Sequence, residues 1–181
     1  MTRLPLDLSK RHWLAAASRL ALGGITAASL AGCGFQLRGA ASYQYAFDSV
    51  FSGFSPSSSL GQDFKRIALA WGLKVFDDAA GASKAQVVLR VHSELREKVV
   101  VGTGIAGQVR EFQLRVRLKF SLFSKSGKLL IDEVEILQQR EVSYSESAAL
   151  AKEAEEQLLY RDMQQEVVLQ LMRRLAAIKT I

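Results

Sequence analysis

The sequence is poor in cysteine, histidine and proline, and each shortage excludes a class of protein. A single cysteine among 181 residues leaves no partner for a disulfide within the chain. Of the two histidines, His12 lies in the N-terminal segment described below, so His92 alone cannot form a multi-histidine metal site. With 2 prolines, 49% hydrophobic residues and 23% charged residues, the chain is neither disordered nor fibrous. We therefore predict one folded domain with no metal and no cofactor.

The apolar run near the N-terminus is too short to cross a membrane. Residues 20–31 are uncharged and end in small side chains, whereas a transmembrane helix needs about 20 residues. Four basic residues and one aspartate precede this run, which is the arrangement of a secretory signal. Residues 9–14 loosely resemble a twin-arginine motif with lysine in place of the first arginine, so the twin-arginine and general secretory routes both stay open.

The lone cysteine follows this run directly, because residues 30–33 read Leu-Ala-Gly-Cys. This motif resembles the lipobox of bacterial lipoproteins, in which the signal is cut before the cysteine and the cysteine is acylated. We therefore expect a lipoprotein signal peptide at residues 1–32, a single domain at residues 33–181 and lipidation of Cys33. Processing removes four basic residues and one aspartate, which lowers the formal charge from +6 to +3. The case for a nucleic-acid partner weakens accordingly, and we predict none.

Alternating apolar residues predict most of the strands. Residues 45–51 are rich in aromatic and β-branched side chains and are expected to form the first strand. Residues 112–122 alternate apolar and polar side chains without a break and predict a strand with one apolar face. Between these segments, residues 85–101 alternate in the same way, with His92 on the polar face; the expected apolar set is Val87, Leu89, Val91 and Leu95.

The residues that follow predict a hairpin. Residues 124–128 read Ser-Lys-Ser-Gly-Lys. The three residues between Ser124 and Lys128 form the expected loop, in which Gly127 takes the left-handed conformation. The register that pairs Ser124 with Lys128 sets outward cations opposite glutamates, namely Lys119 opposite Glu133 and Arg117 opposite Glu135. The same register turns two charged residues toward the core, which indicates a bulge or the sheet rim: Asp132 and Arg140.

Two helices complete the expected fold. The first begins at a cap formed by Ser58 or Ser59 and continues to Leu73. The second occupies residues 148–178, which hold no glycine or proline, with Ser147 as N-cap. Its apolar stripe consists of Val168, Leu171, Leu175 and Ile178. The order β-α-β-β-β-α predicts an α+β fold with two α-helices packed on one face of a four-stranded, mostly antiparallel β-sheet.

No group of residues points to catalysis. Residues 102–107 match the G-x-G-x-x-G pattern of dinucleotide sites, but a strand follows them where that mechanism requires a helix, so we expect a loop. Glu133 and Glu135 are assigned to charge pairing, while a hydrolase that uses only carboxylates stays open as an alternative. We predict that the chain is not an enzyme.

Three cations are candidate ligands for an anion: Arg110, Arg115 and Lys152. Arg110 and Arg115 have no acidic partner in the expected register. Lys152 lies in the first turns of the long helix, where a cation meets the positive end of the helix dipole. A phosphate group there would interact favourably with both the helix amides and the ammonium group. The alternative for Lys152 is an ion pair with Glu156, four residues along the helix.

Three stretches of the sequence resemble one known family. Residues 33–38 read Cys-Gly-Phe-Gln-Leu-Arg, residues 111–114 read Glu-Phe-Gln-Leu, and residues 149–152 read Ala-Leu-Ala-Lys, with Asp-Met at 162–163. In this order they are similar to the mature start, the central strand and the final helix of the LptE family of lipopolysaccharide-assembly lipoproteins. The family's fold, two helices on a four-stranded sheet, agrees with the order of elements above.

The resemblance implies an outer-membrane lipoprotein that faces the periplasm and the lumen of LptD, the β-barrel of lipopolysaccharide transport. Such a protein plugs the barrel, helps it assemble and binds lipopolysaccharide through basic residues. Lys152 is the basic residue at a matching position, whereas the loop 102–108 departs from the family pattern because it has none. Gly34 after the cysteine resembles sorting to the outer membrane. The alternative is a periplasm-facing lipoprotein that binds a different ligand or envelope partner.

Overall fold

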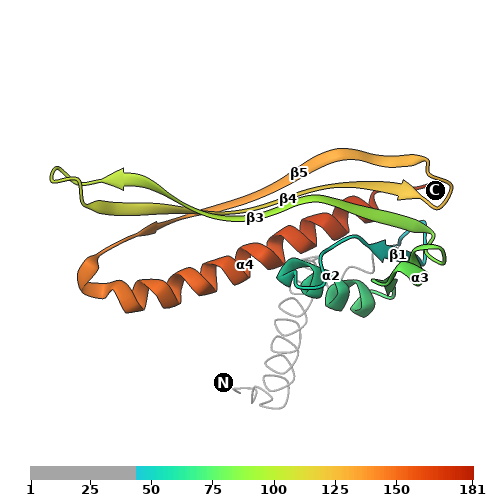
Figure 1. Cartoon of the computed structure of the whole chain (residues 1–181), viewed down its shortest axis with the longest axis horizontal. Coiled ribbons are helices and arrows are strands. Elements are labelled where there is room, and N and C mark those ends of the chain that lie inside the picture. The colour runs from blue at the N-terminus through green and yellow to red at the C-terminus, as the bar shows by residue number, and fades with distance from the viewer. Residues whose placement is uncertain (1–43) are drawn as a thin grey trace, which may run out of the picture. The chain divides into compact units, whose positions relative to one another are not determined.

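The computed structural model describes residues 44–181, which form one mixed sheet with helices on one of its faces (Figure 1). The sheet has five strands in the order β2-β1-β3-β4-β5. The predicted signal peptide and Cys33 lie outside the described residues. In chain order the elements are β1 (Ser49–Ser52), α2 (Ser59–Ala70), β2 (Lys74–Phe76), α3 (Ala79–Ala82), β3 (Val87–Thr103), β4 (Val109–Ser124), β5 (Leu129–Ser143), the 3-10 helix η1 (Glu146–Ala148) and α4 (Ala149–Ala176).

The predicted α+β class is confirmed, but a four-stranded sheet with two helices is wrong in detail. The sequence did not predict β2, which pairs parallel with β1, or the short helix α3. β1 also pairs parallel with β3, and it begins at Ser49 rather than at residue 45. A strand of three residues is too short to display an alternating pattern, which explains why β2 was missed.

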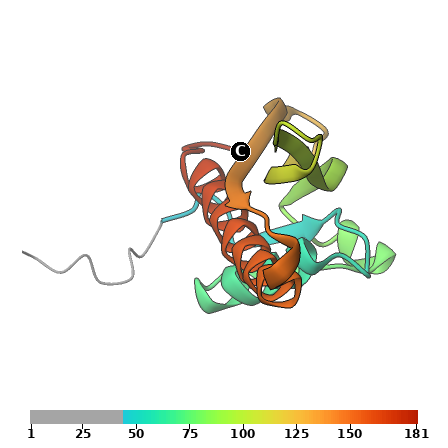
Figure 2. The ribbon, with the colours of Figure 1, turned by 90° about the vertical axis from the view of Figure 1, so that its left-hand side faces the viewer.

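The antiparallel strands β3, β4 and β5 form the larger part of the sheet, and β4 is its centre. The unbroken alternation predicted for residues 112–122 is confirmed, since one face of β4 is buried: Leu114, Val116, Leu118, Phe120 and Leu122. The long helices α2 and α4 pack on this face, below the sheet in Figure 1. Figure 1 shows α4 running along the length of these strands, and Figure 2 shows the same arrangement from the end at which α4 begins.

The predicted hairpin loop is confirmed, but the predicted register holds only beside it. The Ser124 amide donates to the Lys128 carbonyl at 2.8 Å, and Gly127 has a φ of +85°. Two irregularities between Phe120 and Phe123 then shift the pairing by two residues. Lys119 therefore lies opposite Glu135 rather than Glu133, and the shift leaves Asp132 exposed. These irregularities are the bulge that the inward-turned Asp132 indicated. Arg140, opposite Leu114, stays on the side that faces the helices, where it pairs with Glu166 of α4 at 2.9 Å.

α2 begins where the sequence predicts but ends at Ala70, three residues before the predicted Leu73. The Ser58 side chain accepts a hydrogen bond from the Gly61 amide at 2.8 Å, and a cap of this kind stabilises a helix by about 1 kcal/mol. After the last turn, Gly72 has a φ of +86°, which a residue with a side chain rarely adopts. α2 buries Leu60, Phe64 and Ala68 against the sheet and α4.

α4 is a single helix of 28 residues, but its predicted cap is wrong. The 3-10 turn η1 precedes it, and Ser147 bonds to Ser145 at 2.8 Å between side-chain oxygens instead of capping the helix. The predicted stripe is confirmed, since Val168, Leu171 and Leu175 are buried and Ile178 packs against the core from beyond the helix end; the other large buried residues of α4 are Tyr160, Met163, Val167 and Met172.

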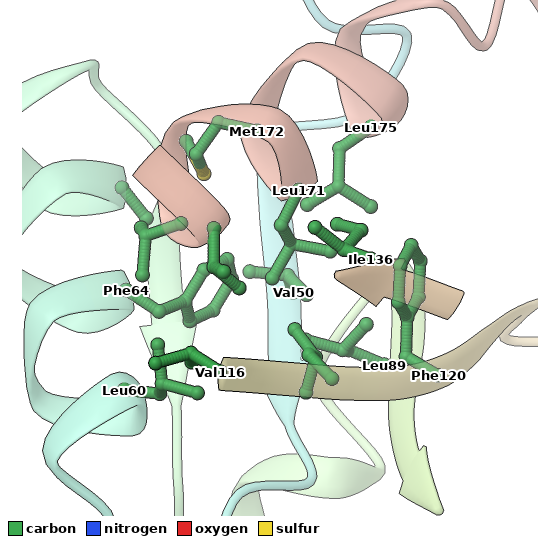
Figure 3. Close-up of a cluster of buried hydrophobic side chains, with 14 of the residues drawn as sticks. Val50, Leu60, Phe64, Leu89, Val116, Phe120, Ile136, Leu171, Met172 and Leu175 are labelled. Atoms are coloured by element: carbon green, nitrogen blue, oxygen red, sulfur yellow. The ribbon is translucent and has the colours of Figure 1, made fainter. Parts of the chain in front are cut away.

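The core joins both helices to the sheet (Figure 3). One buried cluster contains four large side chains that are 0% exposed: Leu171 and Leu175 of α4, Phe64 of α2 and Phe120 of β4. Fully burying a side chain of this size stabilises the fold by roughly 1.5–3 kcal/mol. This cluster lies under the C-terminal half of α4, which leaves the N-terminal half outside the core.

Candidate functional site

An irregularity in β3 creates the polar region under the N-terminal half of α4. Val91 pairs with Phe120 and Ser93 with Lys119, so His92 is an extra residue without a partner in the ladder. A bulge of one residue exchanges the two faces of the strand beyond it. Leu95 therefore turns away from the helices and is 47% exposed, contrary to the prediction from the sequence. In its place, charged residues share the helix-facing side with buried residues of β4: Glu94, Arg96 and Lys98.

Two of these charged residues contact α4 directly. The Lys98 ammonium lies 2.5 Å from a carboxylate oxygen of Glu156 and 4.3 Å from the centre of the Phe112 ring. The Arg96 guanidinium donates to Gln157 at 3.1 Å and lies 3.6 Å from the centre of the Tyr160 ring. Each cation therefore combines a polar contact with a cation–π contact, which aligns the helix along β3.

Tyr160 marks the boundary between this polar region and the core. Its hydroxyl donates to the main-chain carbonyl of Glu97 at 2.7 Å, and the residue is only 3% exposed. Burial raises the pKa of the Tyr160 hydroxyl above its ordinary value, although the nearby Arg96 guanidinium opposes that shift. The side chain is therefore a neutral hydrogen-bond donor that ties α4 to β3.

Lys152 lies at the start of α4, as predicted, and its carboxylate partner is not the Glu156 of the alternative interpretation. Its ammonium contacts Glu155 at 2.8 Å, three residues along the helix, and Ser143 at the end of β5 at 3.1 Å. In place of the alternative pair between Lys152 and Glu156, Lys98 contacts the Glu156 carboxylate. The Lys152 side chain is 25% exposed, so a ligand can still reach it.

Arg110 lies at the same end of the domain as Lys152. It lines an open cavity of about 180 Å³ with Tyr144 and the Ser145–Ser147 segment that leads into α4. Lys152 lines a second cavity, of about 130 Å³, which Tyr144 also borders. The Tyr144 ring, which borders both cavities, meets Phe112 edge to face with 5.3 Å between the ring centres. The structure thus brings Arg110 and Lys152 to neighbouring cavities.

Arg115 lies on the other face of the sheet. Its neighbours along β4, Leu114 and Val116, are buried under the helices, so alternation turns Arg115 away from α4. Its guanidinium donates to Gln113 at 2.7 Å, and the described residues give it no carboxylate partner. On the same outer face, Glu135 pairs with both Arg117 and Lys119, at 3.1 Å and 3.7 Å.

Apolar side chains are exposed beside the two cations. Ile105, in the turn between β3 and β4, is 111% exposed, and Leu150, in the first turn of α4, is 83% exposed. Residues 104–107 form the tip of a hairpin, so the G-x-G-x-x-G motif belongs to a turn between strands, as expected. We call the region that contains this turn, η1 and the first three turns of α4 the distal end.

Other features of residues 44–181 carry less chemistry. His92 is exposed and shares a hydrogen bond of 2.8 Å with Ser121. No three metal-ligating side chains in this part of the chain lie close enough to hold an ion. Nor does a helix there combine the length and apolar character needed to cross a bilayer. A cavity of about 390 Å³ lies beside the start of α2, where Ser58 donates to Glu94 at 2.6 Å.

The sequence predicted the two cations of the distal end but not the polar contacts beneath α4. Arg96 and Lys98 belong to a strand whose simple alternation places them toward solvent, and only the bulge at His92 turns them to the helix. The sequence holds one signal of that bulge. After Val91, the next apolar position of the alternation is occupied by Ser93, and Leu95 follows in a charged stretch.

Comparisons with known proteins agree with this architecture. A family model described as LptE, lipopolysaccharide-assembly, matches residues 54–175, and no curated protein matches the sequence. The solution structure of an uncharacterized lipoprotein B from Nitrosomonas europaea is 32% identical and covers 80% of this chain and 91% of its own, with a TM-score of 0.66.

Two crystal structures share the fold at lower identity. Rare lipoprotein B from Shewanella oneidensis is 19% identical, with 71% of this chain and 94% of that one covered and a TM-score of 0.60. A minor lipoprotein from Acinetobacter baumannii is 18% identical, with 74% and 94% covered and a TM-score of 0.59.

Proposed function

Because the chain belongs to the LptE family of lipopolysaccharide-assembly proteins, we propose that it is an outer-membrane lipoprotein that plugs the LptD β-barrel. In this role it helps the barrel assemble and binds lipopolysaccharide on its way to the outer leaflet. The observation that carries the proposal is the family match over residues 54–175, which takes in β3, β4, β5 and nearly all of α4. The LptE family is not a family of enzymes, and we propose no catalytic activity for this chain.

The proposed anchor is Cys33, acylated after removal of residues 1–32. Each buried methylene of an acyl chain contributes about 0.8 kcal/mol to membrane attachment, so stable anchoring requires more than one chain. Between Cys33 and the first described residue, Gln44, lie ten residues. Fully extended, ten residues span about 33–36 Å, which lets the folded domain reach away from the membrane surface into a barrel.

The proposed lipopolysaccharide contacts lie at the distal end. Lipid A phosphates match the Lys152 ammonium and the Arg110 guanidinium in charge. The start of α4 has no side-chain cap at Ala148, so the positive end of the helix dipole lies beside Lys152 without a competing side-chain oxygen from that position. The exposed side chains of Ile105 and Leu150 suit acyl chains beside those phosphates. Arg115, on the outer face of the sheet, is a separate candidate that cannot act at the same phosphate as Lys152.

Co-purification tests the proposal. Tagged full-length protein, extracted from cells in mild detergent, is expected to bring down LptD, which mass spectrometry identifies. The Cys33→Ala variant is the control for the anchor, and we expect it to lose membrane attachment. Recovery of a different envelope protein, or of no barrel at all, would replace the proposal with the alternative of a periplasm-facing lipoprotein that binds another partner.

A further inference from the structure

β5 is an edge strand with a free side. It has 15 residues and stands last in the strand order, so β4 is its only neighbour in the sheet of residues 44–181. Exposed main-chain groups along an edge of this length form a template for a strand from another chain. Most proteins shorten or cover such an edge, and α4 packs on the face of this sheet rather than pairing with β5.

The hydrogen-bond pattern identifies the main-chain groups on the free side. The Tyr144 amide donates to the Arg110 carbonyl at 2.8 Å, which makes these two opposed residues a hydrogen-bonded pair. The register continues without irregularity through β5 residues 134–143. Because hydrogen-bonded and non-hydrogen-bonded pairs alternate in antiparallel strands, every second residue of β5 directs its N–H and C=O away from β4. These residues are Glu135, Leu137, Gln139 and Glu141.

Two side chains of β5 agree with this assignment and cover part of the edge. The Arg140 guanidinium donates to the Gln139 carbonyl at 2.9 Å, and the Glu133 amide donates to the Asp132 carboxylate at 2.7 Å. Between these bonds, the main-chain groups of Glu135 and Leu137 that face outward have no partner among residues 44–181. Leu137 is also 40% exposed. The uncovered part of the edge is therefore a short, defined window.

The charge of β5 limits which strand can pair with this window. The strand carries four carboxylates against one cation, in a chain whose formal charge is +6. Like charges on facing strands are destabilising, so a second copy of β5 or another acidic strand pairs poorly. We propose that the free edge of β5 binds an extended, basic segment of a partner protein by strand addition. Main-chain hydrogen bonds supply the affinity. Glu135 is already paired with Arg117 and Lys119, so the selectivity comes from the β5 carboxylates that have no ion pair among residues 44–181: Asp132, Glu133 and Glu141.

A pair of synthetic peptides tests the proposal with the full-length protein in detergent micelles. One is a nonapeptide that alternates lysine with valine, and the other has glutamate in place of every lysine. We expect the lysine peptide to slow amide hydrogen exchange at Leu137 and Gln139 at least fivefold, while the glutamate peptide leaves it unchanged. Equal effects of the two peptides, or no effect of either, would overturn the proposal.

Proline variants place the binding on the free side. Gln139→Pro removes an N–H that points away from β4, so we expect the lysine peptide to bind at least tenfold more weakly while the melting temperature changes little. The matched control, Gln138→Pro, removes an N–H bonded to β4 and is expected to lower the melting temperature clearly. Unchanged peptide affinity in folded Gln139→Pro would contradict strand addition.

A charge variant decides the matter if Gln139→Pro does not fold. The double variant Glu133→Lys with Glu141→Lys keeps every main-chain group of the edge. This variant is expected to bind the glutamate peptide and no longer the lysine peptide. If it still prefers the lysine peptide, the role of charge is refuted. These assays do not involve LptD, so their outcome is independent of the proposed function.

Discussion

The two halves of α4 contact the same sheet through different chemistry. All eight buried residues of the helix lie between Tyr160 and Ala176, where they pack on the apolar side chains of β4 and on α2. Residues 149–159 include no fully buried residue. Leu159, next to Tyr160, packs partly buried against the core, and the other contacts of this segment with the sheet are polar ones to Arg96, Lys98 and Ser143. The core half is thus held by burial, and the distal half by ion pairs and hydrogen bonds.

This difference separates stability from binding within one helix. Burial of apolar area is the dominant stabilising term in folding, whereas partly exposed ion pairs contribute about 0.2–1 kcal/mol each. The distal half therefore contributes little to the stability of the fold, and its cations and exposed apolar side chains remain accessible to a ligand. Four changes, taken from the largest expected effect on stability to the smallest, test this division.

The largest effect is expected from truncation in the core half. Leu171→Ala leaves a cavity at a site with 0% exposure and should lower the free energy of unfolding by about 2–5 kcal/mol. Leu158→Ala, on the distal side of Tyr160 in the same helix and 58% exposed, should change it by less than about 0.5 kcal/mol. Urea unfolding measures both values. Equal losses in the two variants would show that the halves do not differ.

A smaller effect is expected at the boundary. Tyr160→Phe removes the hydrogen bond to the Glu97 carbonyl and should lower the free energy of unfolding by about 0.5–1.5 kcal/mol. Burial raises the pKa of Tyr160 in the folded state, so its stabilising contribution is complete below the unfolded value of about 10 and is lost as the pH rises above it. Between pH 8 and pH 11, the free energy of unfolding should therefore fall more steeply with pH for the wild type than for Tyr160→Phe. An equal pH dependence in the two proteins would refute this.

The ion pair of the distal half should have a smaller effect still. A double-mutant cycle with Lys98→Met and Glu156→Gln is expected to give a coupling energy of about 0.2–1 kcal/mol. Because salt screens partly exposed charges, 1 M salt should speed amide exchange in residues 149–159 and leave the core half unchanged. Salt-independent exchange in residues 149–159 would mean that apolar contacts hold the distal half too.

The sequence predicted the fold best where one periodicity continued without interruption. The alternation of β4, the cap of α2 at Ser58 and the apolar stripe of α4 were confirmed because each depends on local spacing. The bulge at His92 and the shift between Phe120 and Phe123 were not located, since each depends on packing between strands rather than on the order of residues. A single extra residue was enough to reverse the predicted orientation of Leu95.

In the candidate site, too, local features were predicted and contacts between distant segments were not. Arg110 and Lys152 were singled out from local features, namely a missing acidic partner and a cation at a helix start, and the structure brings both to the distal end. The alternative pair of Lys152 with Glu156 does not form, since Lys98, on a strand more than fifty residues away in the sequence, contacts Glu156 instead. Arg115 shares a strand with Arg110 but lies on the face opposite to α4, a separation that charge counting along one strand does not reveal.

Binding of lipopolysaccharide to the Lys152→Glu variant tests the role of the distal end most directly. The favourable interaction of glutamate with the helix dipole and the loss of the pair with Glu155 are each worth a few tenths of a kcal/mol, so the melting temperature should hardly change. We predict that affinity for purified lipopolysaccharide falls at least tenfold. Arg161→Glu, the same charge change at an exposed position in α4, should retain the wild-type affinity. Unchanged binding by a folded Lys152→Glu variant, or an equal loss in Arg161→Glu, would contradict a lipopolysaccharide site at the distal end.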